Sequence, residues 1–279
     1  WHYEKVDFEP GGKDHSTAGG SYDTGKLIIK ELYNEEAPLY VMYDFITIKG
    51  AGGKISSSLG NVITLAEALE VYEPEVVRFL FAGTRPNTEF AISFDLDVVK
   101  IYEDFDRLEE RYYNDAADER DKRIYELSCI KVGNRKPERI GFRHLTMLVQ
   151  IHDDVKNISK DKEILGRAVC AKNWIEKYAP EEFKFKVHEK ESKEILKLLN
   201  KKQKESLKLL EKFLAKKKFT EQELFNEFYE ICKQTEIDNT EFFRGAYLAL
   251  IGKERGPRLA SFILAIGKEK VLRLLKEIK

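Results

Sequence analysis

The sequence predicts an α/β region followed by an all-α region. Three observations lead to this fold class: an almost continuous apolar run at 39–48, a glycine-rich loop with a helix signal directly after it, and apolar residues at helical spacing from residue 74 onward. The chain has 279 residues, which is enough for about two domains. Hydrophobic residues make up 42% of it, so each domain can form a core.

The first 38 residues are rich in glycine and turn-forming residues. Residues 11–16 read Gly-Gly-Lys-Asp-His-Ser, and a second glycine pair follows at positions 19 and 20. A short helix is expected at 24–33, with Asp23 or Thr24 as its N-cap. We therefore expect turns and one helix before the first strand.

Residues 39–48 (LYVMYDFITI) predict one strand. Such a run is typical of a strand that is buried on both faces of a parallel sheet. It leads into a glycine loop at 50–61, after which Thr64 and Glu67 form a capping-box signature for a helix towards Tyr72. A doubly wound sheet needs several strands, and only one or two are expected here, so the missing strands should lie upstream of Trp1.

From residue 74 onward the pattern is helical. Two helices are predicted from apolar spacing, one through Val76, Val77, Leu80 and Phe81, the next through Val98, Ile101, Tyr102, Phe105 and Leu108. The acidic run at 95–126 is expected to be a solvated helix face, and the polar segment 114–140, with one possible strand at 124–132, predicts a boundary. Beyond it we expect helices near 142–153, 161–178, 190–215, 221–234, 240–251 and 257–278, the last broken at Gly267.

Charge and cysteine content narrow the function classes. The net charge is −1, but residues 181–279 hold 23 basic against 17 acidic side chains, which suggests an anionic partner or, as charge alone favours, a solvated Lys/Glu surface. No apolar run approaches the ~20 residues that cross a bilayer. Three scattered cysteines (Cys129, Cys170, Cys232), expected as small core residues, give neither a disulfide framework nor a metal knuckle. With no leader pattern, we expect a cytoplasmic protein.

The loop at 50–61 has the composition of a phosphate-binding segment. Backbone N–H groups of glycines can point at phosphate oxygens, Lys54 adds a mobile cation, and Ser56, Ser57 and Ser58 add hydroxyl donors. In isolation such a segment usually means a flexible hinge. Its place between a strand and a capped helix favours ligand binding. The spacing does not fit a P-loop.

Three blocks of the chain resemble one family. Residues 53–61 (GKISSSLGN) resemble the KMSKS loop of class I aminoacyl-tRNA synthetases, in a form similar to the class I lysyl-tRNA synthetases of archaea and some bacteria. Residues 8–16 (FEPGGKDHS) are similar to the GxDH-type turn that lines the ATP and adenylate pocket. Residues 242–275 are similar to the end of the helical anticodon-binding domain that class I lysyl and glutamyl enzymes share. The resemblance covers essentially the whole chain.

The sequence also departs from the family pattern. The His-Ile-Gly-His-type motif and the zinc-binding cysteines of the family's N-terminal half are absent, and Ser57 replaces the usual second lysine of the loop. We therefore expect a C-terminal portion that alone is inactive. The resemblance implies three parts: 1–72, the C-terminal part of a Rossmann-like nucleotide-binding domain; 73–140, a stem-contact helical region; and 141–279, a helical anticodon-binding domain.

The resemblance implies a lysine–tRNA ligase. Lysine and ATP would give lysyl-adenylate and pyrophosphate, and the lysyl group would move to the terminal adenosine of tRNA(Lys). Mg²⁺ is expected with ATP; no metal site, zinc, DNA or membrane partner is expected in this part. The implied catalytic residues are Lys54, Ser56, Ser57 and Ser58, and the implied ATP and adenylate residues are Gly11, Gly12, Asp14 and His15.

The remaining contacts are a lysine site and a tRNA site. At the strand end, Tyr40, Tyr43 and Asp44 are candidates for lysine binding, and Tyr43 is chosen. Arg244, Arg255 and Arg258 are assigned to tRNA, and a lysine-rich helix at 197–218 either follows the tRNA backbone or is a solvated face. The alternatives are a glutamyl-type synthetase, whose relatives usually carry a Lys-Leu-Ser-Lys-Arg loop, and a non-catalytic tRNA-binding module.

Overall fold

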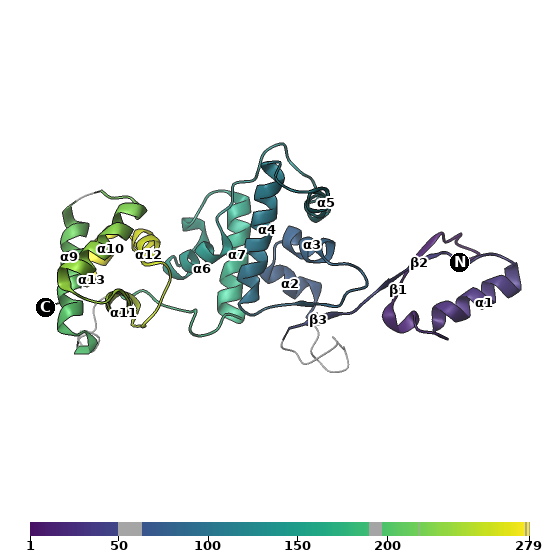
Figure 1. Cartoon of the computed structure of the whole chain (residues 1–279), viewed down its shortest axis with the longest axis horizontal. Helices are drawn as coiled ribbons and strands as arrows, with labels where there is room; N and C mark the ends of the chain where they lie inside the picture. The colour runs from purple at the N-terminus through teal and green to yellow at the C-terminus, as the bar shows by residue number, and fades with distance from the viewer. Residues whose placement is uncertain (50–62, 190–196, 217, 277, 279) are drawn as a thin grey trace. The chain divides into compact units, whose positions relative to one another are not determined.

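Short strands of the first part of the chain form two separate parallel pairs. β1 (Phe8–Gly12) pairs with β2 (Leu39–Tyr43) (Figure 1), and β3 (Ile46–Ile48) pairs with β4 (Phe90–Ile92). The computed structural model describes residues 1–49, 63–189, 197–216, 218–276 and 278. It divides into two units, Trp1–Gly141 and Phe142–Lys279, and each is described by itself.

The single strand predicted at 39–48 is wrong, because these residues form two strands in different sheets. The chain changes partner at Asp44, whose carboxylate accepts a hydrogen bond from the Phe45 N–H at 2.8 Å and whose own N–H donates to the Pro86 carbonyl at 2.8 Å. Burial on both faces is wrong as well, since β2 side chains alternate between exposed and half-buried, and Leu39 is 70% exposed. Apolar composition predicted extended backbone but not the point where its hydrogen-bond partner changes.

The glycine-rich start of the chain contains a strand that the sequence did not predict. β1 is extended through Gly11, where an added Cβ would lie 1.7 Å from the Tyr40 Oη, so only glycine fits beside that ring. A 3₁₀ turn, η1 (Lys13–His15), follows β1. Helix α1 (Ser21–Tyr33) begins earlier than the predicted start at 24, with Gly20 as its N-cap.

The remaining elements of the first unit are mostly helical, as predicted. α2 (Leu65–Val71) begins at the expected Thr64–Glu67 capping box. The two helices predicted from the spacing of apolar residues are α3 (Pro74–Gly83) and α4 (Asp97–Tyr113). The possible strand at 124–132 is wrong, because α5 (Glu119–Ser128) occupies most of it. Asp118 caps α5 by accepting from the Asp121 N–H at 2.8 Å, and this local signal outweighs the β-branched residues that follow.

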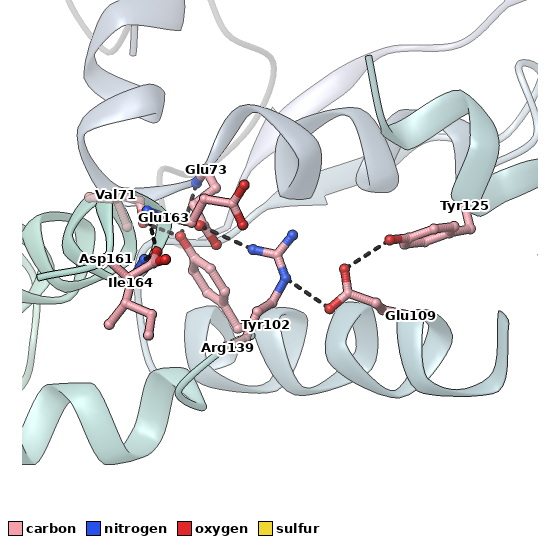
Figure 2. Close-up of polar contacts among 9 residues, drawn as sticks. All are labelled: Val71, Glu73, Tyr102, Glu109, Tyr125, Arg139, Asp161, Glu163 and Ile164. Atoms are coloured by element: carbon pink, nitrogen blue, oxygen red, sulfur yellow. Dashed lines mark hydrogen bonds and ion pairs between the residues drawn. The ribbon is translucent and has the colours of Figure 1, made fainter. Parts of the chain in front are cut away.

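One acidic side chain of the run at 95–126, that of Glu109, is buried, which corrects the expectation of a wholly solvated face. The Glu109 carboxylate on α4 accepts from Arg139 Nε at 2.8 Å and from the Tyr125 hydroxyl at 2.9 Å (Figure 2). Arg139 also lies 3.5 Å from a carboxylate oxygen of Glu73, at the start of α3. Charge pairing therefore compensates the desolvation of Glu109 and joins α3, α4, α5 and the segment before Gly141.

The second unit is all-helical in its described residues, as predicted. Its helices are α6 (Phe142–Ile151), α7 (Lys162–Lys177), α9 (Lys201–Lys216), α10 (Glu221–Thr235), α11 (Asn239–Ile251), α12 (Leu259–Ile266) and α13 (Lys268–Lys276), with the 3₁₀ turn η3 (Val155–Asn157) before α7. The predicted break at Gly267 is confirmed, with φ +92°. None of the described helices is long and apolar enough to cross a membrane.

Local signals set where the helices of this unit begin. Asp161 caps α7 by accepting from the Glu163 and Ile164 N–H groups (Figure 2). The continuous helix predicted at 190–215 is wrong at Asn200, whose carboxamide oxygen accepts from the Gln203 N–H at 2.9 Å and caps α9. Residues 190–196 of that prediction lie outside the described residues.

Aromatic and aliphatic side chains fill the core of the second unit. Phe142, Trp174, Phe228, Phe242 and Phe262 are fully buried. Two of the three cysteines, Cys170 and Cys232, are buried as expected, but Cys129 in the first unit is only half-buried.

Candidate functional site

Parallel pairing of β1 with β2 brings the expected nucleotide and amino-acid residues together. In the register of this pair Gly12 lies opposite Tyr43, so the turn η1 and Asp44 emerge at the same edge. Ligands of α/β proteins bind outside the carboxyl ends of parallel strands. Residues separated by about thirty positions in the sequence thus form one candidate site, which consists of Gly11, Gly12, Asp14, His15 and Tyr43.

Tyr43 offers an accessible aromatic ring at this edge. Its side chain is 49% exposed, and a Cβ placed on Gly12 would lie 3.6 Å from the ring. The ring therefore stands over the backbone of Gly12, where an ammonium group could approach the aromatic face.

Tyr40, considered from the sequence but not chosen, shapes the same turn. Its hydroxyl lies 2.8 Å from Ser16 Oγ, which donates to the Gly12 carbonyl at 2.9 Å. The Tyr40 ring also stacks on Tyr22, with the ring centroids 3.8 Å apart. The space beside Gly11, where we expected a nucleotide to approach the backbone, holds the Tyr40 ring. This contact fixes the turn and leaves Gly12 facing Tyr43.

Asp14 and His15 are exposed on η1. His15 Nδ1 lies 3.0 Å from the Ser21 hydroxyl at the start of α1, which orients the imidazole. Both side chains can reach solvent beside Gly12. The turn therefore presents a carboxylate and an imidazole that could contact ribose, phosphate or an ammonium group.

An ion pair between Lys13 and Asp44, which was not predicted from the sequence, lies at this edge. Lys13 Nζ lies 2.9 Å from the Asp44 carboxylate, and the Asp44 side chain is only 9% exposed. Hydrogen bonds from Lys13 and then from the Phe45 N–H hold the pKa of Asp44 below its ordinary value. Asp44 in turn raises the pKa of Lys13, and Glu89 adds to the effect. Nothing in the sequence marks this pair, because it depends on which strands are neighbours.

The four predicted catalytic residues, Lys54, Ser56, Ser57 and Ser58, lie outside the described residues. Both flanks of their segment are described. Before it, Lys49 forms ion pairs with Asp95, at 3.1 Å, and with Asp97 at the start of α4. After it, the Thr64–Glu67 capping box starts α2.

The three arginines assigned to tRNA gather at one loop of the second unit. Arg244 on α11 donates from Nε to Glu254 at 3.0 Å, and Arg255 and Arg258 are exposed on the same loop between α11 and α12. The loop packs against Tyr247, whose hydroxyl donates a hydrogen bond to the Pro257 carbonyl. Arg244 is therefore engaged in holding the loop, and Arg255 and Arg258 present their charge to solvent.

Helix α9 carries a second basic surface, which we name the α9 lysine ridge. Its members recur at helical spacing outside the buried stripe of Leu207, Leu210 and Leu214. They are the exposed Lys201, Lys208 and Lys212 and the half-buried Lys204. The neighbouring helix α10 is acidic and has four glutamates against one lysine. An anionic backbone would thus meet attraction along α9 and repulsion along α10.

No group of His, Cys, Asp or Glu side chains among the described residues could hold a metal ion. His144 and His152 were not predicted to be metal ligands, and neither belongs to such a group among the described residues.

Comparisons with known proteins assign the two regions. Residues 1–131 match a family described as tRNA synthetases class I (K), and residues 175–279 match an anticodon binding domain. The chain therefore contains a class I tRNA synthetase domain followed by an anticodon-binding domain, and the predicted fold class, α/β followed by all-α, is confirmed.

Within that class, the relatives are lysine–tRNA ligases. The one from Borrelia garinii subsp. bavariensis is 48% identical over 99% of this chain and 56% of its own length, and the one from Pyrococcus horikoshii is 40% identical over the same shares. The chain spans about half the length of the curated relatives it matches. A glutamate tRNA ligase structure from Elizabethkingia meningosepticum, in complex with its amino acid, aligns at 13% identity with a TM-score of 0.46, over 100% of this chain and 58% of its own. The resemblance to class I lysyl-tRNA synthetases is confirmed.

Proposed function

We propose that the protein containing this chain is a lysine–tRNA ligase that acts in the cytoplasm. It would join lysine to ATP as lysyl-adenylate, release pyrophosphate, and transfer the lysyl group to the terminal adenosine of tRNA(Lys). The observation that carries the proposal is identity of 40–48% to lysine–tRNA ligases across 99% of the chain. ATP use is a property of the family as a whole.

In the first step, the lysine carboxylate attacks the α-phosphate of MgATP and pyrophosphate leaves. Charge builds on the phosphate oxygens, and donors already aimed at them lower the barrier. We assign this role to Lys54, with Ser56, Ser57 and Ser58 as hydroxyl donors. Their position in the sequence, directly between β3 and the capped start of α2, supports this assignment.

The carboxyl edge of β1 and β2 would hold the adenylate. Gly12 leaves its backbone open to a close approach, and Asp14 and His15 stand exposed on the adjoining turn. Asp14 would accept from a ribose hydroxyl or the substrate ammonium, and the half-exposed ring of Tyr43 would face the lysine side chain. A cation over such a ring gains about 0.5–2 kcal/mol.

The helical unit would hold the tRNA. Arg255 and Arg258 would contact phosphates or base edges from their exposed loop, with Arg244 holding that loop. The α9 lysine ridge would follow the phosphate backbone and make affinity depend on salt.

Amino-acid-dependent pyrophosphate–ATP exchange by the full-length protein tests the proposal. We expect exchange with lysine and none with glutamate. The variant Lys54→Ala should slow adenylate formation by about 10²–10³, as removal of one transition-state donor does. Lys30→Met, on the exposed face of α1, is the control.

Retention of lysine tRNAs from total RNA by the same protein is the second measurement. Exchange with glutamate, or enrichment of glutamate tRNAs, would make the protein a glutamyl-type enzyme. Retention of tRNA without exchange for any amino acid would leave a tRNA-binding module.

A further inference from the structure

Asp44 lies where three segments of the first unit meet. One oxygen of its carboxylate accepts from Lys13 Nζ at 2.9 Å, and the other accepts from the Phe45 N–H at 2.8 Å. Its backbone N–H donates to the Pro86 carbonyl in the segment between α3 and β4. The carboxylate is nearly buried although it carries charge, and both oxygens have partners.

The partners of Asp44 connect the two sheets. Lys13 is the first residue of η1, the turn that carries Asp14 and His15 at the end of β1. Phe45 is the last residue before β3, and its carbonyl accepts from the Phe90 N–H at the start of β4. Asp44 therefore sets the position of η1 against the strand pair β3–β4.

The far end of β3 is fixed in the same manner. Lys49 follows β3 directly and pairs with Asp95 and Asp97, at the start of α4. An ion pair thus lies near each end of this three-residue strand, in addition to its pairing with β4.

We propose that Asp44 is a positioning residue for adenylate formation, which acts by holding η1, with Asp14 and His15, in fixed geometry relative to β3. This inference rests on the function proposed above. In this role Asp44 acts through Lys13 and the Phe45 N–H, from which its two oxygens accept hydrogen bonds.

The stability and the rate should respond differently when this contact is lost. Lys13 is 50% exposed, and an ion pair with an exposed partner adds little to the stability of a fold. Displacement of reacting groups by about 1 Å, in contrast, can slow a reaction about 10²-fold. A role in positioning alone therefore predicts a slow enzyme with a nearly normal melting temperature.

The experiment measures single-turnover adenylate formation and the melting temperature of the full-length protein. Asp44→Ala and Lys13→Met should each lower the rate about 10- to 100-fold, while the Tm falls by less than about 4 °C. The double variant should be at most about twofold slower than the slower of the two single variants, because both substitutions remove the same contact. Lys13→Arg, which keeps the cation, should restore the rate to within about threefold of the original.

Glu36→Ala is the matched control. It breaks the Lys30–Glu36 pair, which has a similar distance of 2.7 Å and an exposed lysine but lies away from the carboxyl edge. We expect no change in rate. Additive losses in the double variant, a normal rate in Asp44→Ala, or an equal loss in Glu36→Ala would overturn the proposal.

Hydrogen exchange of the backbone separates failure of this proposal from failure of the proposed function. In Asp44→Ala, amide exchange should become faster in both 13–16 and 46–48, and Glu36→Ala should leave both segments unchanged. If the unaltered protein forms no adenylate with lysine, the proposed function is wrong, and the exchange data still decide whether Asp44 joins the two segments. Unchanged exchange in either segment would overturn the positioning role.

Discussion

At the scale of single residues, Glu109 has the largest energetic consequence that we infer in the first unit. Its carboxylate is fully buried and is balanced by Arg139, which also reaches Glu73 (Figure 2). Glu109 raises the pKa of Tyr125 further, in addition to the larger effect of burial. Loss of the cation would leave a buried charge without its partner, whereas loss of an exposed cation would be almost neutral.

Arg139→Met should therefore destabilise the first unit by about 3–5 kcal/mol. Urea denaturation followed by hydrogen exchange in α4 and α5 measures this free energy of unfolding. The control is Arg123→Met, which removes an exposed ion pair with Glu126 and should cost less than about 1 kcal/mol. Equal losses in the two variants would show that the buried network adds nothing specific.

Two histidines should make the second unit sensitive to pH. Burial lowers the pKa of both His144 and His188 from an ordinary value of 6.5, and His144 should contribute less to the pH dependence because that residue is exposed. The unfolded chain therefore binds protons at a higher pH than the folded chain does, so stability is complete above about pH 6.5 and falls as the pH drops towards the folded pKa values.

The melting temperature of this unit should decrease between pH 7.5 and pH 5.5. The double variant His144→Gln/His188→Gln should show a flatter profile over this range, and His152→Gln, which leaves both of these histidines in place, is the control and should keep the original slope. A profile that is equally steep in the double variant would exclude these two groups as its cause.

At the scale of elements, α9 and α10 divide the charge of the second unit. The side of α9 away from its buried leucines carries the α9 lysine ridge, whereas α10 has a net acidic surface. Helix periodicity alone placed the lysines on one face. Only packing of the helices shows that the neighbouring surface repels phosphate.

Lys208→Ala/Lys212→Ala should weaken tRNA binding and lower the slope of log affinity against log salt by about 2. Each lysine that neutralises a phosphate releases about one counterion, so loss of two reduces the release accordingly. Filter binding between 50 and 200 mM salt, roughly the range in which such contacts matter, measures the slope. Lys233→Ala on α10 is the control, and an equal change in that variant would argue against a ridge-specific contact.

Elements with strong local signals were predicted well. The capping box at Thr64 and Glu67, the break at Gly267 and the helical spacing of α4 depend on residues within a few positions of each other. The strand at 124–132 and the unbroken helix through Asn200 were wrong, because caps at Asp118 and Asn200 outweighed the residue preferences around them. β1 was missed because its glycines suggested turns.

At the scale of the whole molecule, the chain consists of two units with separate cores. The core of Phe142–Lys279 is formed by its own aromatic residues, which include Trp174, Phe228 and Phe262. A unit that buries its own apolar surface can fold without the rest of the chain.

Residues 142–279 alone should therefore form a folded helical protein with a cooperative thermal transition, and they should bind tRNA with a salt slope close to that of the full chain. Circular dichroism and filter binding measure both properties. A helical fragment with no tRNA affinity would place the binding determinants in Trp1–Gly141, and an unfolded fragment would show that the two units depend on each other.

The sequence by itself determined the order of most helices, the Thr64–Glu67 capping box, the break at Gly267, the glycine-rich segment and the motifs typical of the family. These features are encoded in neighbouring residues, whose backbone preferences and hydrogen bonds act locally. Only the tertiary structure decided that Gly12 faces Tyr43, that Lys13 pairs with Asp44, and that Glu109 is buried against Arg139. Such contacts join residues about 30 positions apart, and their existence depends on which strands and helices become neighbours. Composition cannot specify this, since a glutamate on a solvated face and a glutamate in a buried ion pair look the same in a sequence.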